Sequence, residues 1–97
     1  MRIYPNMTKE DQIDKDVIRD ELTSKNVQLI MLEQPGVMEG IAVHQGDNFY
    51  EIYLNLETQE IYSEIPENFV LLNTYLEKAI RSGGVSAANP YLIGLLE

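Results

Sequence analysis

Between residues 37 and 65 the chain alternates apolar and polar residues, and this alternation restricts its possible folds more than any other feature. A period of two predicts β-strands with one face buried. The pattern breaks at Gln45-Gly46-Asp47-Asn48 and again at Thr58-Gln59, and both breaks are typical of turns. We therefore expect antiparallel strands over about 37–44, 49–57 and 60–65.

The apolar positions also predict how these strands pair. Across the turn at Gly46, a shared buried face pairs Ile41 with Ile52. The same register places Gly40 opposite Tyr53, whose ring can cover the glycine.

Across the turn at 58–59, the same rule pairs Leu56 with Ile61 and Ile52 with Ile65. An apolar run over 27–32 predicts one more strand, buried on both faces. The residues at 34–37, Gln-Pro-Gly-Val, predict a type II turn that leads into the next strand.

Two segments outside the strands have a helical period. A helix is predicted over about 9–24, with Thr8 and Asp11 as a partial capping box and an apolar stripe of Ile13, Val17, Ile18 and Leu22. A second helix is predicted after Pro66 and ends at Gly83-Gly84, with apolar positions Phe69, Leu72, Leu76, Ala79 and Ile80. The alternative is an extended 69–72 followed by a short helix from Thr74.

These elements predict one α+β domain over 1–97, in the order helix, four strands, helix. We expect an antiparallel sheet of about four strands with the helices packed on one face. Residues 1–7 form an N-terminal extension. The tail, 85–97, is apolar, and it docks on its own domain or buries against another chain through Tyr91, Leu92, Ile93, Leu95 and Leu96.

Charge is distributed unevenly along the chain. The formal net charge is −9, and residues 26–77 contain nine acids with no lysine or arginine. A surface of one negative sign disfavours direct binding to nucleic acid or anionic membrane and favours a basic protein partner. The alternative is that the acidity only keeps the protein soluble.

Few residues could carry out chemistry. The chain has no cysteine, which excludes disulfides, thiolate catalysis and cysteine-bound zinc. His44 is the single histidine, and we interpret it as a surface imidazole opposite Phe49 rather than a general base. Gly83-Gly84 follows a helix, which is the wrong context for a phosphate-binding loop. We expect no metal site, no cofactor and no enzymatic activity.

The location is predicted from two further features. No apolar run approaches the roughly 20 residues that span a membrane. The first residues lack the apolar centre of a signal peptide. With the absence of cysteine, these features favour a cytoplasmic protein.

The strongest functional candidate is the polar side of the 49–65 hairpin, which we call the tyrosine–carboxylate face. It consists of Glu51, Tyr53, Asn55, Glu57, Glu60, Tyr62 and Glu64. Tyrosine is enriched at protein interfaces and carboxylates can bind arginine, so the face predicts a site for a basic protein. It could instead be an ordinary solvent-exposed face, or the second helix could cover it.

Small size, acidity and the lack of an active site are shared by bacterial immunity proteins and phage antagonists of host defence. The sequence therefore favours an inhibitor of a basic nucleic-acid-processing enzyme or toxin, with spaced carboxylates that could imitate a row of phosphates. The alternative is a structural subunit that oligomerises through its tail.

Overall fold

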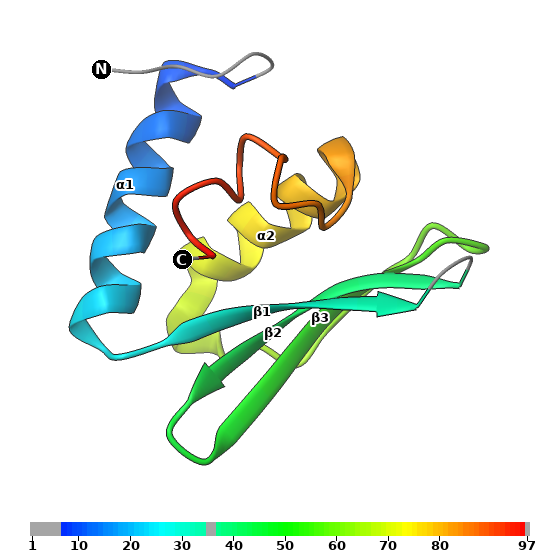
Figure 1. The fold of residues 1–97 in the computed structure, drawn as a ribbon, viewed down its shortest axis with the longest axis horizontal. Helices are drawn as coiled ribbons and strands as arrows, with labels where there is room; N and C mark the ends of the chain where they lie inside the picture. Colours follow the sequence, from blue (N-terminus) through cyan, green and yellow to red (C-terminus); the bar gives the residue numbers. More distant parts are fainter. Residues whose placement is uncertain (1–6, 35–36, 97) are drawn as a thin grey trace.

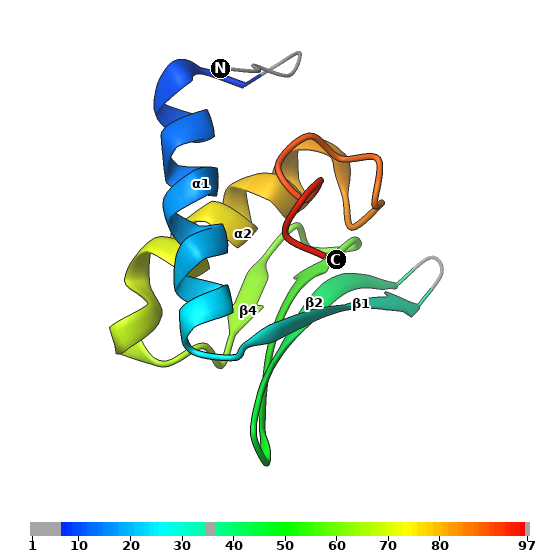
Figure 2. The same cartoon turned by 60° about the vertical axis from the view of Figure 1, so that its left-hand side comes forward.

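Two helices lie on one face of a four-stranded antiparallel sheet, as the sequence predicts, and the C-terminal segment lies on the same side (Figures 1 and 2). The computed structural model describes residues 7–34 and 37–96. The turn predicted at Pro35-Gly36 lies outside these ranges. The elements are α1 (Lys9–Ser24), β1 (Gln28–Gln34), β2 (Met38–Gln45), β3 (Asn48–Asn55), β4 (Ile61–Ser63), the 3-10 turn η1 (Glu67–Phe69) and α2 (Val70–Gly83). The strands follow one another across the sheet in chain order.

The pairing of β2 with β3 confirms the predicted register. Ile41 lies opposite Ile52, and Gly40 lies opposite Tyr53. Ile41 and Ile52 are fully buried on the face that the helices cover. The alternation therefore assigned the two faces of this hairpin correctly.

Gly40 is a position where only glycine fits. A Cβ atom built there would lie 2.8 Å from both the Ile52 carbonyl oxygen and the Tyr53 Cβ atom. We expect Gly40→Ala to lower the free energy of unfolding by about 1–3 kcal/mol, because the backbone of β3 has to move. Urea unfolding followed by circular dichroism measures this loss. Gly46→Asn is the control, since no atom lies within 4 Å of a Cβ there and asparagine tolerates its positive φ.

The predicted register of β3 with β4 is wrong by two residues. Leu54 pairs with Ile61 and Ile52 with Ser63. The loop is longer than a two-residue turn because the Asn55 carbonyl accepts from the Gln59 N–H at 2.7 Å, with Gln59 at a φ of 64°. A shift of two residues keeps each side chain on its predicted face.

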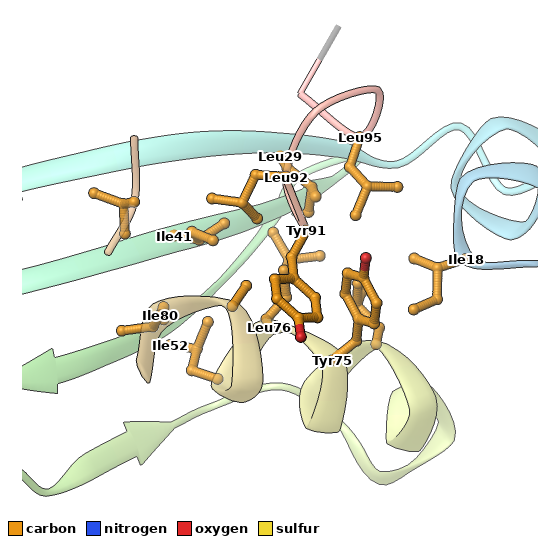
Figure 3. Packing of buried hydrophobic residues seen from close by; sticks show 14 of the residues in the cluster. Ile18, Leu29, Ile41, Ile52, Tyr75, Leu76, Ile80, Tyr91, Leu92 and Leu95 are labelled. Atoms are coloured by element: carbon orange, nitrogen blue, oxygen red, sulfur yellow. The ribbon is translucent and has the colours of Figure 1, made fainter. Parts of the chain in front are cut away.

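Strand β1 was predicted to be buried on both faces, and this is wrong. It forms one edge of the sheet, and Ile30 and Met31 are 41% and 37% exposed. An apolar run shows that a strand is apolar on both sides but not what covers each side. Leu29 alone among its central residues is buried, beneath the C-terminal segment (Figure 3).

Helix α1 has the predicted bounds and capping box, but only half of its apolar stripe is buried. Ile18 and Leu22 enter the core, whereas Ile13 and Val17 are about half exposed. The first half of the helix instead buries three polar side chains: Asp11, Gln12 and Lys15. The sequence did not show this because burial there depends on polar partners from other segments.

The helical turns that follow Pro66 favour the single-helix prediction over the alternative. Residues 67–69 form η1, which leads directly into α2, so no new helix begins at Thr74. Gly84 ends α2 with a φ of 77°, which a residue without a side chain adopts readily. Phe69, Leu72, Leu76 and Ile80 are buried at the predicted spacing.

The C-terminal segment completes the core. Tyr91, Leu92 and Leu95 are buried, with Leu92 fully enclosed between α2 and β1 (Figure 3). The Asn89 side chain donates to the carbonyls of Ala79 at 2.9 Å and Gly84 at 3.0 Å, which holds the segment to the end of α2. Of the two predicted fates of this segment, the structure shows docking on its own domain.

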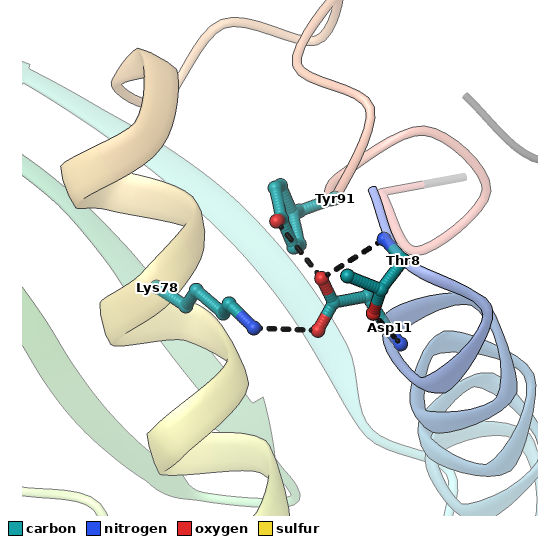
Figure 4. A network of polar contacts seen from close by, with 4 residues as sticks. All are labelled: Thr8, Asp11, Lys78 and Tyr91. Carbon is teal, nitrogen blue, oxygen red and sulfur yellow. Dashed lines mark hydrogen bonds and ion pairs between the residues drawn. The ribbon is translucent and has the colours of Figure 1, made fainter. Parts of the chain in front are cut away.

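Asp11 connects three segments of the chain through one buried carboxylate (Figure 4). It accepts from Lys78 Nζ at 2.6 Å, from the Tyr91 hydroxyl at 3.1 Å and from the Thr8 N–H at 3.3 Å. Burial alone raises the pKa of Asp11, but these three hydrogen bonds together outweigh it and place the pKa below its ordinary value. The carboxylate therefore fixes α1, α2 and the C-terminal segment relative to one another.

Candidate protein-binding face

The helices cover one side of the sheet (Figure 2), and the tyrosine–carboxylate face lies on the other, because the residues that alternate with it along β3, Ile52 and Leu54, are buried in the core. Strands β3 and β4 supply its regular part, because Glu51, Tyr53 and Tyr62 are outward-facing residues of these strands. The loop between the strands supplies Glu57 and Glu60. Helix α2 packs on the opposite face, so the alternative in which it covers this face is wrong.

Two tyrosines form the centre of the face. Tyr53 and Tyr62 lie directly opposite one another, with ring centroids 5.1 Å apart and ring planes inclined by 36°. Tyr62 is 50% exposed, and Tyr53 is half-buried over Gly40. Aromatic rings of this kind offer contact area and lose little side-chain entropy on binding.

Two acidic residues, Glu51 and Glu64, lie opposite one another on neighbouring segments of the face. The Glu64 N–H donates to the Glu51 carbonyl at 2.8 Å, and the Glu64 carboxylate accepts from the Glu51 N–H at 3.3 Å. Both side chains are exposed. Like charges on directly opposed residues destabilise a sheet, so this pair has a cost that a positively charged partner would offset.

Asn55 has a structural role that the sequence did not indicate. Its Oδ1 atom accepts from the N–H groups of Glu57 at 2.9 Å and Thr58 at 3.1 Å, which shapes the loop. Glu57 and Glu60 are exposed on that loop. Asn55 therefore positions two of the carboxylates and its amide oxygen is already occupied.

One base approaches the face from outside the base-free segment. Arg81 of α2 donates from Nη1 to the Gln59 carbonyl at 3.2 Å, and it also pairs with Glu77. Among the side chains that the structure describes, in residues 7–32 and 37–96, the ion pairs are Arg19–Asp16, Lys25–Glu21, Lys78–Asp11 and Arg81–Glu77. None of them neutralises a carboxylate of the face.

The exposed surface is wider and more apolar than the predicted set. Phe49, 58% exposed, stacks on His44 with centroids 4.3 Å apart and an angle of 6° between the rings. Ile30 of β1 points to the same side, and the small Ala42 lies between them on β2. The alternation in the sequence already indicated that Phe49 belongs to this surface, because Phe49 occupies an outward position of β3, as Glu51 and Tyr53 do.

A separate hollow of about 300 Å³ lies between the helices. Its lining is Thr8, Glu10, Asp11, Asp14, Leu71, Thr74, Tyr75 and Lys78. Of its charged lining residues, Lys78 and Asp11 already pair with one another. In the part of the chain that the structure describes, no group of three or more His, Asp or Glu side chains is arranged for a metal ion.

Comparison with known proteins adds no counterpart to this face. No family model matches the chain, and neither a curated protein nor a solved structure matches it. Among the described residues, no helix has the length and apolarity that crossing a bilayer requires.

Proposed function

We propose that the protein binds a basic protein through the tyrosine–carboxylate face and has no catalytic activity of its own. The partner that fits best is a nucleic-acid-processing enzyme or a toxin, because such proteins carry arginine- and lysine-lined channels for phosphates. Binding would block that channel, as immunity proteins and phage antagonists of host defence do. We place this interaction in the cytoplasm, with which a chain without cysteine is compatible.

The observation that carries the proposal is a tyrosine pair, with Tyr62 exposed and Tyr53 half-buried, beside carboxylates without an ion-pair partner among the described residues. Tyr53 and Tyr62 lie on a regular sheet and contact one another, so little side-chain conformational entropy would be lost when a partner binds. Arginine side chains can stack on such rings and bind carboxylates with two parallel hydrogen bonds. Glu51 is the outward residue of β3 two positions before Tyr53, and Glu64 lies two positions after Tyr62, which supports this mode of binding.

We expect Glu51→Lys to weaken partner binding at least tenfold, because truncating a buried interfacial charge pair already costs about 2–5 kcal/mol. The new lysine would oppose Glu64 across the strands, so the variant should be at least as stable as the natural chain. The partner is first captured from the native host with the tagged chain and identified by mass spectrometry. Calorimetry with that purified partner then measures the affinity.

Asp20→Lys is the matched control, since it makes the same charge change on an exposed residue of α1. Asp20→Lys should reduce the affinity only slightly, and this reduction should become smaller as the salt concentration rises. Equal losses for Glu51→Lys and Asp20→Lys would show that net charge, and not this face, drives binding. A captured partner without a basic surface would contradict the proposed class of partner.

A further inference from the structure

The two edges of the sheet differ in how they are protected. Strand β4 forms one edge with only three residues, and short edges resist further pairing. Strand β1 forms the other edge with seven residues, Gln28–Gln34. Its register with β2 runs without a break from Gln28 opposite His44 to Gln34 opposite Met38, so no bulge turns the edge away.

The outer side of β1 has no bonding partner among the described residues. Outside the ladder to β2, no hydrogen bond there involves a backbone group of residues 28–34. The strand contains no lysine, arginine or proline, and its single charged residue is Glu33, near its end, so little of its length carries the charges that natural proteins place on exposed edges. Ile30 and Met31 are 41% and 37% exposed along it.

The sequence of β1, Gln-Leu-Ile-Met-Leu-Glu-Gln, is nearly symmetric about Met31. Two copies aligned antiparallel about that residue would pair all seven positions. Gln28 would then oppose Gln34, and Ile30 would oppose Leu32, so at these positions residues of like polarity meet. Position 33, the glutamate, would oppose Leu29 and no other acid.

Other registers fit less well. A shift of one residue places the helices of the two copies on opposite faces, because side chains alternate with a period of two. A shift of two places Gln28 against Leu32, or Ile30 against Gln34, and leaves two positions unpaired. Pairing about Met31 keeps both helical layers on the same face and joins the two sheets into one.

We propose that β1 is a homodimer interface, in which a two-fold axis at Met31 joins two copies into a continuous eight-stranded antiparallel sheet. The ladder would satisfy the outward backbone groups of both edges, and Met31 of each copy would meet its counterpart. The outer faces of the two sheets would then be continuous, with one tyrosine–carboxylate face at each end. This inference does not depend on the proposed partner.

The absence of natural cysteine makes disulfide formation a direct test. Opposed Cα atoms in an antiparallel pair are about 4.5–5.5 Å apart, within the range that a disulfide bridges. We expect Met31→Cys to form a disulfide-linked dimer under mild oxidation. Ile30→Cys is the matched control, of similar exposure, which should not link to itself but should link to Leu32→Cys when the two variants are mixed.

The unmodified full chain should show the mass of two chains by light scattering, and Met31→Lys should show the mass of one while remaining folded. Since each copy carries a net charge of −9, salt should tighten the dimer, whereas it should weaken binding to a basic partner. A natural chain that is monomeric at every concentration overturns the proposal, even if Met31→Cys forms a disulfide. Equal linking by Met31→Cys and Ile30→Cys overturns it as well.

Discussion

Replacing Leu92 by alanine should lower the free energy of unfolding by about 3 kcal/mol, because the fully buried side chain would leave a cavity between the sheet and the helices. Leu92 belongs to the core cluster together with Leu29, Leu76 and Ile80 (Figure 3). For a domain of this size, such a loss is a large part of the total stability. Urea unfolding followed by circular dichroism would measure it as a lower midpoint with an unchanged slope.

The neighbouring Ile93 provides the control, because it is only half-buried. Ile93→Ala should cost roughly 1 kcal/mol by lost burial alone. Similar small losses for both variants would show that residues 91–96 are not part of the folded core. That result would favour the alternative in which the C-terminal segment packs against another chain.

Asp11→Asn should destabilise the protein by about 2 kcal/mol at neutral pH, because the buried group would no longer pair with Lys78 and would make weaker hydrogen bonds. The pKa of Asp11 is lowered in the folded state, since its hydrogen bonds outweigh the opposing effect of burial. A lowered folded-state pKa gives stability that is present above the unfolded-state pKa and is lost as the pH falls through the folded-state value.

The difference in stability between the natural chain and Asp11→Asn should therefore be constant near neutral pH. It should shrink as the pH falls below about 4, the ordinary aspartate range. Urea unfolding of the natural chain and of Asp11→Asn, repeated from neutral to acid pH, measures this difference in stability. Asp16→Asn serves as the control, because the Asp16–Arg19 pair is exposed and such pairs contribute about 0–1 kcal/mol. A difference that stays constant down to acid pH would contradict the role given to the Asp11 carboxylate.

The candidate face shows how far sequence reasoning extends in this protein. Period-two alternation assigned Glu51, Tyr53 and Tyr62 to one face, and a register error of two residues left that assignment intact. The loop geometry set by Asn55 could not be predicted, because several hydrogen-bonding patterns suit the same turn residues. The exposure of Ile30 could not be predicted either, since the apolar character of a residue does not show whether another element packs on it.

The sequence by itself determined the order of elements, the inward and outward positions of β2 and β3, both ends of α1, the C-terminal end of α2 and the base-free middle segment. These properties depend on neighbouring residues, through strand and helix periods, caps and glycine conformations. Only the tertiary structure decided which face the helices cover, that β1 is an edge, that Leu92 completes the core and that Asp11 meets Lys78 and Tyr91. Those contacts join residues up to 80 positions apart, and their free energy exists only once the chain has brought them together.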